Sequence, residues 1–215
     1  MKPRVIRFIA TQFVAIPLLA ALVLFSAALQ AEVITNDPAS ALERVTKRIF
    51  SKLSENMDEY TENPEALQDL VRTDLMPIID VQYSARLILG RAGRGLEKQK
   101  IDEFAEAMSN LLVNRYAKGL LYFKSLEQLQ ILPIRGELNE KFTRVRTRIK
   151  LPEGGYAPID YAFHMTTEGW KAFDIIVEGI SYVTTYRNQI MPDVLANGID
   201  SVIASLSNGD LDIED

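Results

Sequence analysis

Two carboxylates beside an apolar run are the candidates for acid–base chemistry in this sequence of 215 residues. Asp174 opens and Glu178 closes the stretch DIIVE, and two neighbouring carboxyl groups can serve as proton donor and proton acceptor. An enzyme would also need a nucleophile or an oxyanion donor close by, and the sequence offers no convincing one. We therefore predict solvated or capping roles for both carboxylates and no catalytic residue. A small-molecule enzyme built on a buried Asp174 stays as an alternative hypothesis.

The residue types that bind metals are almost absent. His164 is the single histidine and there is no cysteine, which excludes a disulfide framework, a cysteine-built zinc or iron–sulfur site and a multi-histidine metal cluster. Motifs such as HExxH, GxSxG and the phosphate-binding GxxxxGK[ST] are also missing. We expect no metal and no cofactor, and we expect His164 to be a surface or hydrogen-bonded residue beside Asp160.

Four cations alternate along one predicted strand. Arg144, Arg146, Arg148 and Lys150 occupy every second position, so their side chains share one face of the strand. This stripe is either a solvated face, partly neutralised by Asp160 on the next strand, or a surface that docks on an acidic partner or an anionic membrane. We favour the solvated face. The net charge of -5 argues against a general nucleic-acid-binding protein, which needs an electropositive surface.

Helical spacing of apolar residues dominates the first half of the chain. Asp37 and Asn63 are each followed by proline, which is the residue order typical of a helix start. Pro77 opens another helix, and Gly90 stops it. The predicted helices cover residues 37–62, 64–75, 77–90 and 97–125, with the glycine-rich loop GRAGRG at 90–95.

After Ser125 the apolar spacing changes to every second residue, which predicts strands. Predicted strands cover residues 128–133, 142–151, 159–165 and 170–177, and two helices follow over 185–198 and 200–206. Short turns such as PEGG at 152–155 connect neighbouring strands, which indicates antiparallel pairing with one covered face. The sequence therefore predicts a single α+β domain with a twisted antiparallel sheet of about four strands.

The N-terminus has the layout of a secretory signal peptide. Three cations precede an uncharged stretch from Phe8 to Ala31, which ends in small residues. An uncleaved membrane anchor is the alternative, because the apolar run comes near the length of a spanning helix. We predict a signal peptide over 1–31, a folded domain over 32–207 and an acidic tail over 208–215, and we expect the protein to reach the periplasm.

Three ordered blocks carry a resemblance to a known family. They are VRTDLMPIIDVQYSARLILG at 71–90, GWKAFDIIVEGISYVTTYRNQI at 169–190 and GIDSVIASL at 198–206. In order and spacing they resemble the MlaC family of periplasmic phospholipid-binding proteins, also called the toluene-tolerance family. The match extends from about Asp37 to Leu206, and FDIIVEGIS followed by YR is its most specific part. The basic, glycine-rich segment RAGRGLEKQK at 91–100 departs from the family pattern.

The resemblance implies helices wrapped around the sheet with a deep apolar pocket for phospholipid acyl chains. It also implies a carrier, not an enzyme, that shuttles phospholipid between an outer-membrane lipoprotein complex and an inner-membrane ABC transporter with an MCE-domain subunit. Such a carrier maintains the lipid asymmetry of the outer membrane. A periplasmic adaptor or chaperone, which would purify without lipid, is the other alternative.

The side chains that would line such a pocket lie on the matching segments, at inward strand positions or at helical spacing. The predicted lining residues are Leu75, Ile79, Tyr83, Leu87, Tyr116, Leu120, Tyr161, Phe163, Phe173, Ile175, Val177 and Val183. Each of them would fit an ordinary core equally well. Tyr186 and Arg187 are predicted near the pocket mouth, where a cation would meet a lipid phosphate.

Overall fold

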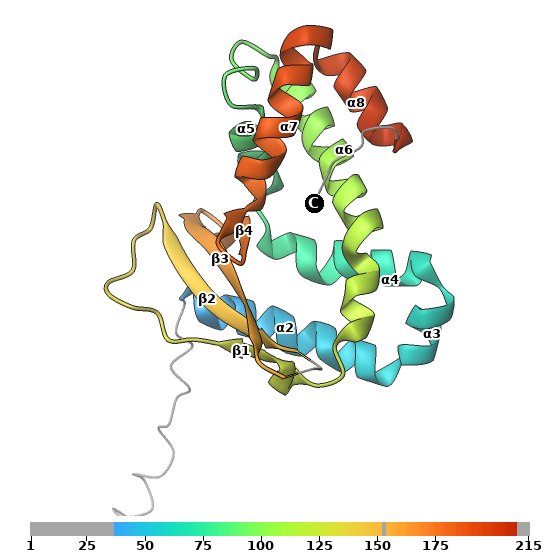
Figure 1. Cartoon of the computed structure of the whole chain (residues 1–215), viewed down its shortest axis with the longest axis vertical. Helices are drawn as coiled ribbons and strands as arrows, with labels where there is room; N and C mark the ends of the chain where they lie inside the picture. The colour runs from blue at the N-terminus through green and yellow to red at the C-terminus, as the bar shows by residue number, and fades with distance from the viewer. Residues whose placement is uncertain (1–36, 152–153, 210–215) are drawn as a thin grey trace, which may run out of the picture. The chain divides into compact units, whose positions relative to one another are not determined.

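The computed structural model describes residues 37–151 and 154–209, which belong to one compact unit that begins at Asn36. The predicted signal peptide and most of the predicted acidic tail lie outside the described residues. Within them the fold is α+β, as predicted, with α-helices packed on and beside one antiparallel sheet (Figure 1).

Four of the described α-helices, α2 (Pro38–Glu55), α4 (Pro64–Leu70), α5 (Val81–Leu89) and α7 (Tyr182–Asn197), begin at a residue whose side chain caps the helix. The Asp37 carboxylate accepts a hydrogen bond from the backbone N–H of Ser40 at 2.9 Å. The Asn63 side chain caps the helix Pro64–Leu70 in the same way, by accepting from the backbone N–H groups of Glu65 and Ala66. The other described α-helices are α3 (Met57–Glu62), α6 (Lys98–Tyr116) and α8 (Ile199–Asn208). A π-helical turn, Val71–Leu75, and a short 3₁₀ turn, Met76–Ile78, join α4 to the segment before α5.

Several predicted helix boundaries were wrong. The long helix expected to reach residue 125 ends at Tyr116 and continues as a 3₁₀ turn through Tyr122. The helix expected from Pro77 begins at Val81 instead, because Ile79 is extended and Asp80 provides the cap. The helix expected from residue 185 begins at residue 182, because the Ser181 hydroxyl accepts from the Thr184 N–H at 3.0 Å.

The sheet has five strands, one more than predicted, in the order β1-β2-β3-β4-β5. The strands are β1 (Leu129–Ile131), β2 (Thr143–Lys150), β3 (Tyr156–Thr166), β4 (Gly169–Val177) and β5 (Ile180–Ser181). The additional strand β5 pairs with β4 through the turn at Glu178 and Gly179, whose φ angles are +51° and +87°. Two consecutive positive φ angles form the tight hairpin turn that matches strand twist, so a strand of two residues can pair there.

The two faces of the sheet differ in chemistry. We call the face that carries Val145, Tyr161 and Ile175 the inner face; these three residues lie opposite one another on β2, β3 and β4. We call the opposite side, with Arg146 and Asp160 in register, the outer face. The inner face packs against α2, which runs along the sheet in Figure 1. The alternation predicted from the sequence is therefore confirmed.

The buried apolar residues form two cores. The sheet core joins α2, α4 and the π-helical turn to the inner face, and Leu53, Leu67, Val145 and Phe163 are its most buried members. The helical core joins α5, α6, α7 and α8 around Phe104. Burial of such side chains contributes about 1.5–3 kcal/mol for each large residue, so the fold needs neither metal nor disulfide.

Candidate ligand-binding site

Asp174 is a capping residue. Its Oδ1 accepts from the backbone N–H of Val183 at 3.0 Å, and its Oδ2 accepts from the Ser181 hydroxyl at 2.6 Å, so both oxygens hold the start of α7. Glu178 lies in the tight turn between β4 and β5. This geometry supports the predicted capping role and gives the enzyme hypothesis no acid–base pair.

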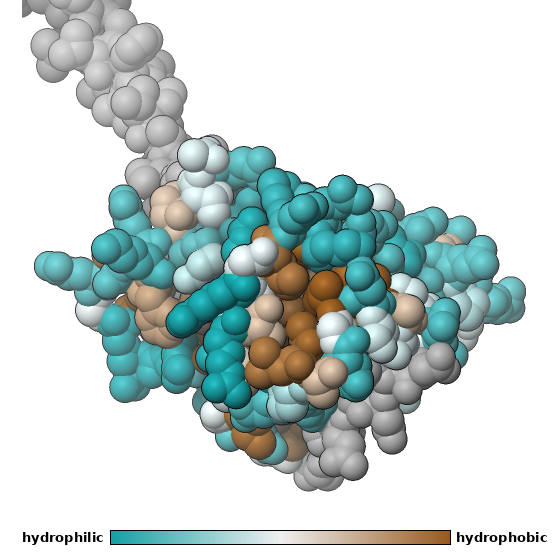
Figure 2. Space-filling model, turned by 90° about the horizontal axis from the view of Figure 1, so that it is seen from above, coloured by the Kyte–Doolittle hydropathy of each residue, from teal (hydrophilic) through white to brown (hydrophobic). Residues whose placement is uncertain are grey.

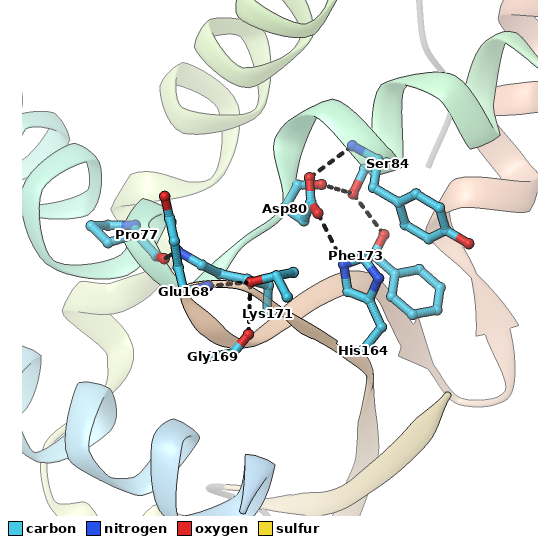
Figure 3. A network of polar contacts seen from close by, with 10 residues as sticks. Pro77, Asp80, Ser84, His164, Glu168, Gly169, Lys171 and Phe173 are labelled. Atoms are coloured by element: carbon cyan, nitrogen blue, oxygen red, sulfur yellow. Dashed lines mark hydrogen bonds and ion pairs between the residues drawn. The ribbon is translucent and has the colours of Figure 1, made fainter. Parts of the chain in front are cut away.

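His164 pairs with a different carboxylate from the one predicted. Its Nε2 lies 2.9 Å from Oδ2 of Asp80 and not beside Asp160, as Figure 3 shows. The other oxygen of Asp80 accepts from the N–H of Tyr83 at 2.8 Å and caps α5. The His164 ring stacks on Tyr83 at 4.5 Å and meets the edge of Phe173. The histidine is thus a hydrogen-bonded residue that ties β3 to α5.

The segment before and within α5 covers the free edge of β4. The Asp80 N–H donates to the carbonyl of Ala172 at 2.7 Å, and the Ser84 hydroxyl donates to the carbonyl of Phe173 at 2.8 Å (Figure 3). Lys171 reaches the carbonyl of Pro77. These contacts satisfy backbone groups that an open sheet edge would otherwise present to solvent. The polar network of Figure 3 is therefore structural.

Two open hollows among the described residues are lined by both polar and apolar side chains. One, of about 530 Å³, lies between the start of α2 and β1, where Lys47 and Ile131 are among its lining residues. The other, of about 390 Å³, is lined by Ile79, Asp80 and Lys171 among others. Of the predicted lining residues, only Ile79 borders either hollow.

Nine of the twelve predicted lining residues fall into three groups. Those in or against the sheet core are Leu75, Ile79, Leu120, Tyr161 and Phe163, and those in or against the helical core are Leu87 and Val183. Tyr83 and Phe173 surround His164 instead, because Phe173 is an extra residue in β4 where the register with β3 shifts. The structure therefore does not bring these two aromatic residues together with the inner-face residues.

Part of the inner face lacks a protein cover among the described residues. Ile175 is 37% exposed and Ile180 is 63% exposed, although both are large and apolar. Tyr161 and Val177, on the same face, are half-buried. Tyr116 and Tyr182 form an edge-to-face pair near the start of α7, with ring centres 6.3 Å apart. The inner face therefore leaves apolar side chains open at Ile175 and Ile180 among the described residues.

The surface also gathers hydrophobic residues elsewhere. Seen from the end where α7 and α8 meet, a hydrophobic area is set among hydrophilic side chains (Figure 2). Leu195 on α7 is 52% exposed. Exposed apolar surface is therefore not confined to the sheet.

The two residues predicted at the pocket mouth make contacts between helices. Tyr186 is 3% exposed, and its hydroxyl lies 3.2 Å from the hydroxyl of Tyr116. The Arg187 Nε donates to the carbonyl oxygen of Leu87 at 2.5 Å and so ties α7 to the last turn of α5. Tyr186 therefore joins α7 to the end of α6, and Arg187 joins α7 to α5.

Sequence reasoning missed Asp74, which anchors the π-helical turn to α2. Asp74 is 5% exposed, and its two carboxylate oxygens lie 2.8 Å from Arg48 Nε and 2.6 Å from Lys52 Nζ. Desolvation raises the pKa of Asp74, but the hydrogen bond from Lys52 and the charges of Lys52 and Arg48 outweigh it, so the pKa lies below its usual value. The available sequence signal was the pair of cations Arg48 and Lys52, four residues apart on α2, and nothing in the sequence links them to Asp74.

The basic stripe lies on the outer face. Arg144 and Lys150 are exposed, and Arg144 lies 3.6 Å from Asp160, as the cross-strand pairing predicted. The Arg148 guanidinium bonds to the side chain of Gln130 and stacks over the ring of Tyr156. The stripe is therefore exposed at Arg144 and Lys150, with one ion pair to Asp160, and the solvated face stays our interpretation.

Within residues 37–151 and 154–209, no cluster of three or more histidine, cysteine or acidic side chains has the arrangement of a metal site. No helix in the same ranges combines the length and apolar character needed to cross a bilayer.

Fold and site together define an α+β protein whose sheet offers a partly open, uncharged apolar face. The chain belongs to the MlaC protein family, whose model matches residues 43–208. The resemblance inferred from the three sequence blocks is confirmed.

Individual relatives agree with this assignment. The chain is 22% identical over 173 residues to the intermembrane phospholipid transport system binding protein MlaC of Haemophilus influenzae, which covers 79% of this chain and 80% of that protein. It is 24% identical over 180 residues to the toluene tolerance protein ttg2D of Pseudomonas putida, with 83% of each chain covered. A phospholipid-binding protein from Ralstonia solanacearum, solved in complex with a phospholipid, has the same fold with a TM-score of 0.72 and 19% identity, over 80% of this chain and 96% of the other.

Proposed function

We propose that this protein is a phospholipid carrier, whose ligand lays its acyl chains against the open part of the inner face. The observation that supports this most directly is the uncharged row Val145, Tyr161 and Ile175, which ends in an exposed isoleucine. The structural neighbour from Ralstonia solanacearum holds a phospholipid, and the relative from Haemophilus influenzae is named for phospholipid transport.

The physical need for a carrier follows from the hydrophobic effect. Exposing a lipid chain to water costs about 0.8 kcal/mol for each methylene group, so free passage of a two-chain lipid between membranes is very slow. A protein that covers the chains with apolar side chains offsets most of this cost. The exposed Ile175 and Ile180 would lose their own contact with water at the same time.

The ligand surface that we propose uses part of the predicted set and leaves out Tyr83 and Phe173, which surround His164. Tyr161, Ile175 and Val177 on the inner face would contact the chains directly, with Leu75, Ile79 and Leu120 behind them. Arg187 stays a proposed headgroup contact through the part of its guanidinium that does not bond to Leu87. An unchanged lipid content in Arg187→Ala would count against that contact.

The setting that we propose is the periplasm, reached through the N-terminal signal peptide. The carrier would exchange lipid with an outer-membrane lipoprotein complex and with an inner-membrane ABC transporter that has an MCE-domain subunit, and so maintain outer-membrane lipid asymmetry. Family membership and the layout of residues 1–31 support this setting.

Purification without detergent tests the proposal. The full chain would be expressed in a bacterium with its own leader, released from the periplasm, and weighed by native and denaturing mass spectrometry. We expect phospholipid at one molecule per chain or close to it. An apoprotein that also takes up no lipid from phospholipid vesicles would contradict the carrier and favour an adaptor.

A further inference from the structure

Tyr161 occupies the middle of the inner face. It lies on β3, the central strand, between Val145 on β2 and Ile175 on β4. Val145 is fully buried, whereas Ile175 is 37% exposed, so Tyr161 stands where the covered part of this face gives way to the open part. Its own side chain is half-buried.

The hydroxyl groups of the inner face differ in their partners. The hydroxyl of Thr147 donates to the carbonyl oxygen of Ile159 at 2.5 Å, and that of Thr143 donates to the carbonyl oxygen of Asn139 at 2.8 Å. The Tyr161 hydroxyl has no hydrogen-bond partner among residues 37–151 and 154–209. The hydroxyl of a half-buried tyrosine usually finds a partner in the protein, in water or in a ligand.

The surroundings of Tyr161 keep the hydroxyl protonated. Desolvation by burial raises the pKa of Tyr161 to about 12, so the group is a neutral donor at every physiological pH. The neighbouring positions on this face, at Val145, Ile175 and Phe163, carry no charge. A neutral donor in uncharged surroundings suits a neutral acceptor.

We propose that the Tyr161 hydroxyl donates a hydrogen bond to an ester carbonyl of the bound lipid and thereby fixes the depth at which the lipid sits. This assignment rests on the proposed carrier function. The ester carbonyls are the neutral acceptors that lie between the acyl chains and the headgroup. A phosphate is a poor match, because a buried anion needs a cation beside it, and this row of the sheet supplies none.

Ester-linked and ether-linked phospholipids separate this contact from general apolar binding. A diether phospholipid with the same headgroup and chain lengths lacks both carbonyls. We expect the unaltered protein to bind the diester about fivefold more tightly than the diether, which is the effect of one net hydrogen bond. Tyr161→Phe should bind both lipids equally, and its thermal midpoint shows whether the variant is folded. Tyr122→Phe, at a tyrosine that is 79% exposed, should keep the full preference.

Infrared spectroscopy supplies a second readout. With a ¹³C-labelled ester carbonyl in the bound lipid, a hydrogen bond lowers the carbonyl stretching frequency, and Tyr161→Phe should return it to the frequency of an unbonded ester. Equal affinity of the unaltered protein for diester and diether, or an unshifted carbonyl band, would overturn the assignment while leaving the carrier intact. Binding of neither lipid would overturn the carrier itself, and this contact with it.

Discussion

The inner and outer faces of the sheet carry different kinds of side chain at neighbouring positions of the same strands. On β2 and β3, Val145 and Tyr161 point inward, while Arg146 and Asp160, one position away, point outward. The inner-face row of Val145, Tyr161 and Ile175 carries no charge, and Ile175 is exposed. Alternation thus gives β2 one apolar face and one charged face, and a shift of one residue would exchange them.

The carboxylates that accompany the two faces differ in the same way. Asp74, in the wall that packs on the inner side, is 5% exposed and meets two cations within 2.8 Å. Asp160, on the outer face, meets Arg144 at 3.6 Å. A buried carboxylate requires close partners, whereas an exposed pair contributes little. The charge of Asp74 is therefore structural, whereas that of Asp160 is mainly solvated.

The largest difference between the two faces is expected when a charge is placed on the inner face. We expect Ile175→Glu to lower the phospholipid content of the purified protein more than about tenfold, because a carboxylate facing acyl chains loses its hydration. The matched variant Arg146→Glu, on the outer face, should keep its lipid. Lipid per protein is measured by mass spectrometry after extraction. Equal lipid contents for the two variants would show that the inner face is not the ligand surface.

The next largest effect concerns Asp74. We expect Asp74→Asn to lower the free energy of unfolding by about 2 kcal/mol in urea titrations, because Arg48 and Lys52 lose their shared partner and a buried site loses its complementary charge. Asp160→Asn should change it by about 0.5 kcal/mol or less. A similar loss in both variants would contradict the distinction between the two carboxylates.

The same carboxylate gives a pH dependence with a defined sign. The pKa of Asp74 is lowered on folding from 3.8, so its contribution is complete above that value and is lost as pH falls through the folded-state pKa. The stability difference between the unaltered protein and Asp74→Asn should therefore shrink below about pH 4. Urea titrations at pH 7 and at successively lower pH measure it, and a gap that widens on acidification would be inconsistent with this assignment.

Asp174 should have a smaller effect. Asp174→Ala removes the acceptor for Ser181 and for the Val183 N–H, and we expect a loss of about 1 kcal/mol, typical of a lost helix cap. Asp174→Asn keeps one acceptor oxygen and should lose less. Urea titration of the three proteins measures the order. An Asn variant less stable than the Ala variant would argue against a capping role.

The features predictable from the sequence were those set by neighbouring residues. Strand alternation identified the inner and outer faces, and Asp37 and Asn63, each followed by proline, marked helix starts correctly. Local pattern also predicted the basic stripe on the outer side. These signals repeat within one element, so one sequence is sufficient to find them.

The features that were missed depend on segments far apart in the chain. His164 was expected beside Asp160, but it pairs with Asp80, 84 residues away. Asp74 meets cations 22 and 26 residues earlier. Phe173 is the extra residue of a bulge in β4, and its ring contacts His164. The spacing of apolar residues in the sequence does not indicate such a bulge. The sequence therefore could not show which of the predicted lining residues lie together, and their role in ligand binding stays a prediction.

The smallest effect is expected on the outer face. Replacing Arg144, Arg146 and Lys150 together by glutamine removes three charges that make, among the described residues, one ion pair at 3.6 Å and one bond to a backbone carbonyl. Since exposed contacts of this kind contribute about 0.5 kcal/mol or less each, the midpoint of urea unfolding and the lipid content should stay almost unchanged. Sedimentation with anionic vesicles at low salt should also be the same for the variant and the unaltered protein. Vesicle binding that the substitutions abolish would contradict a merely solvated face and make the stripe a docking surface.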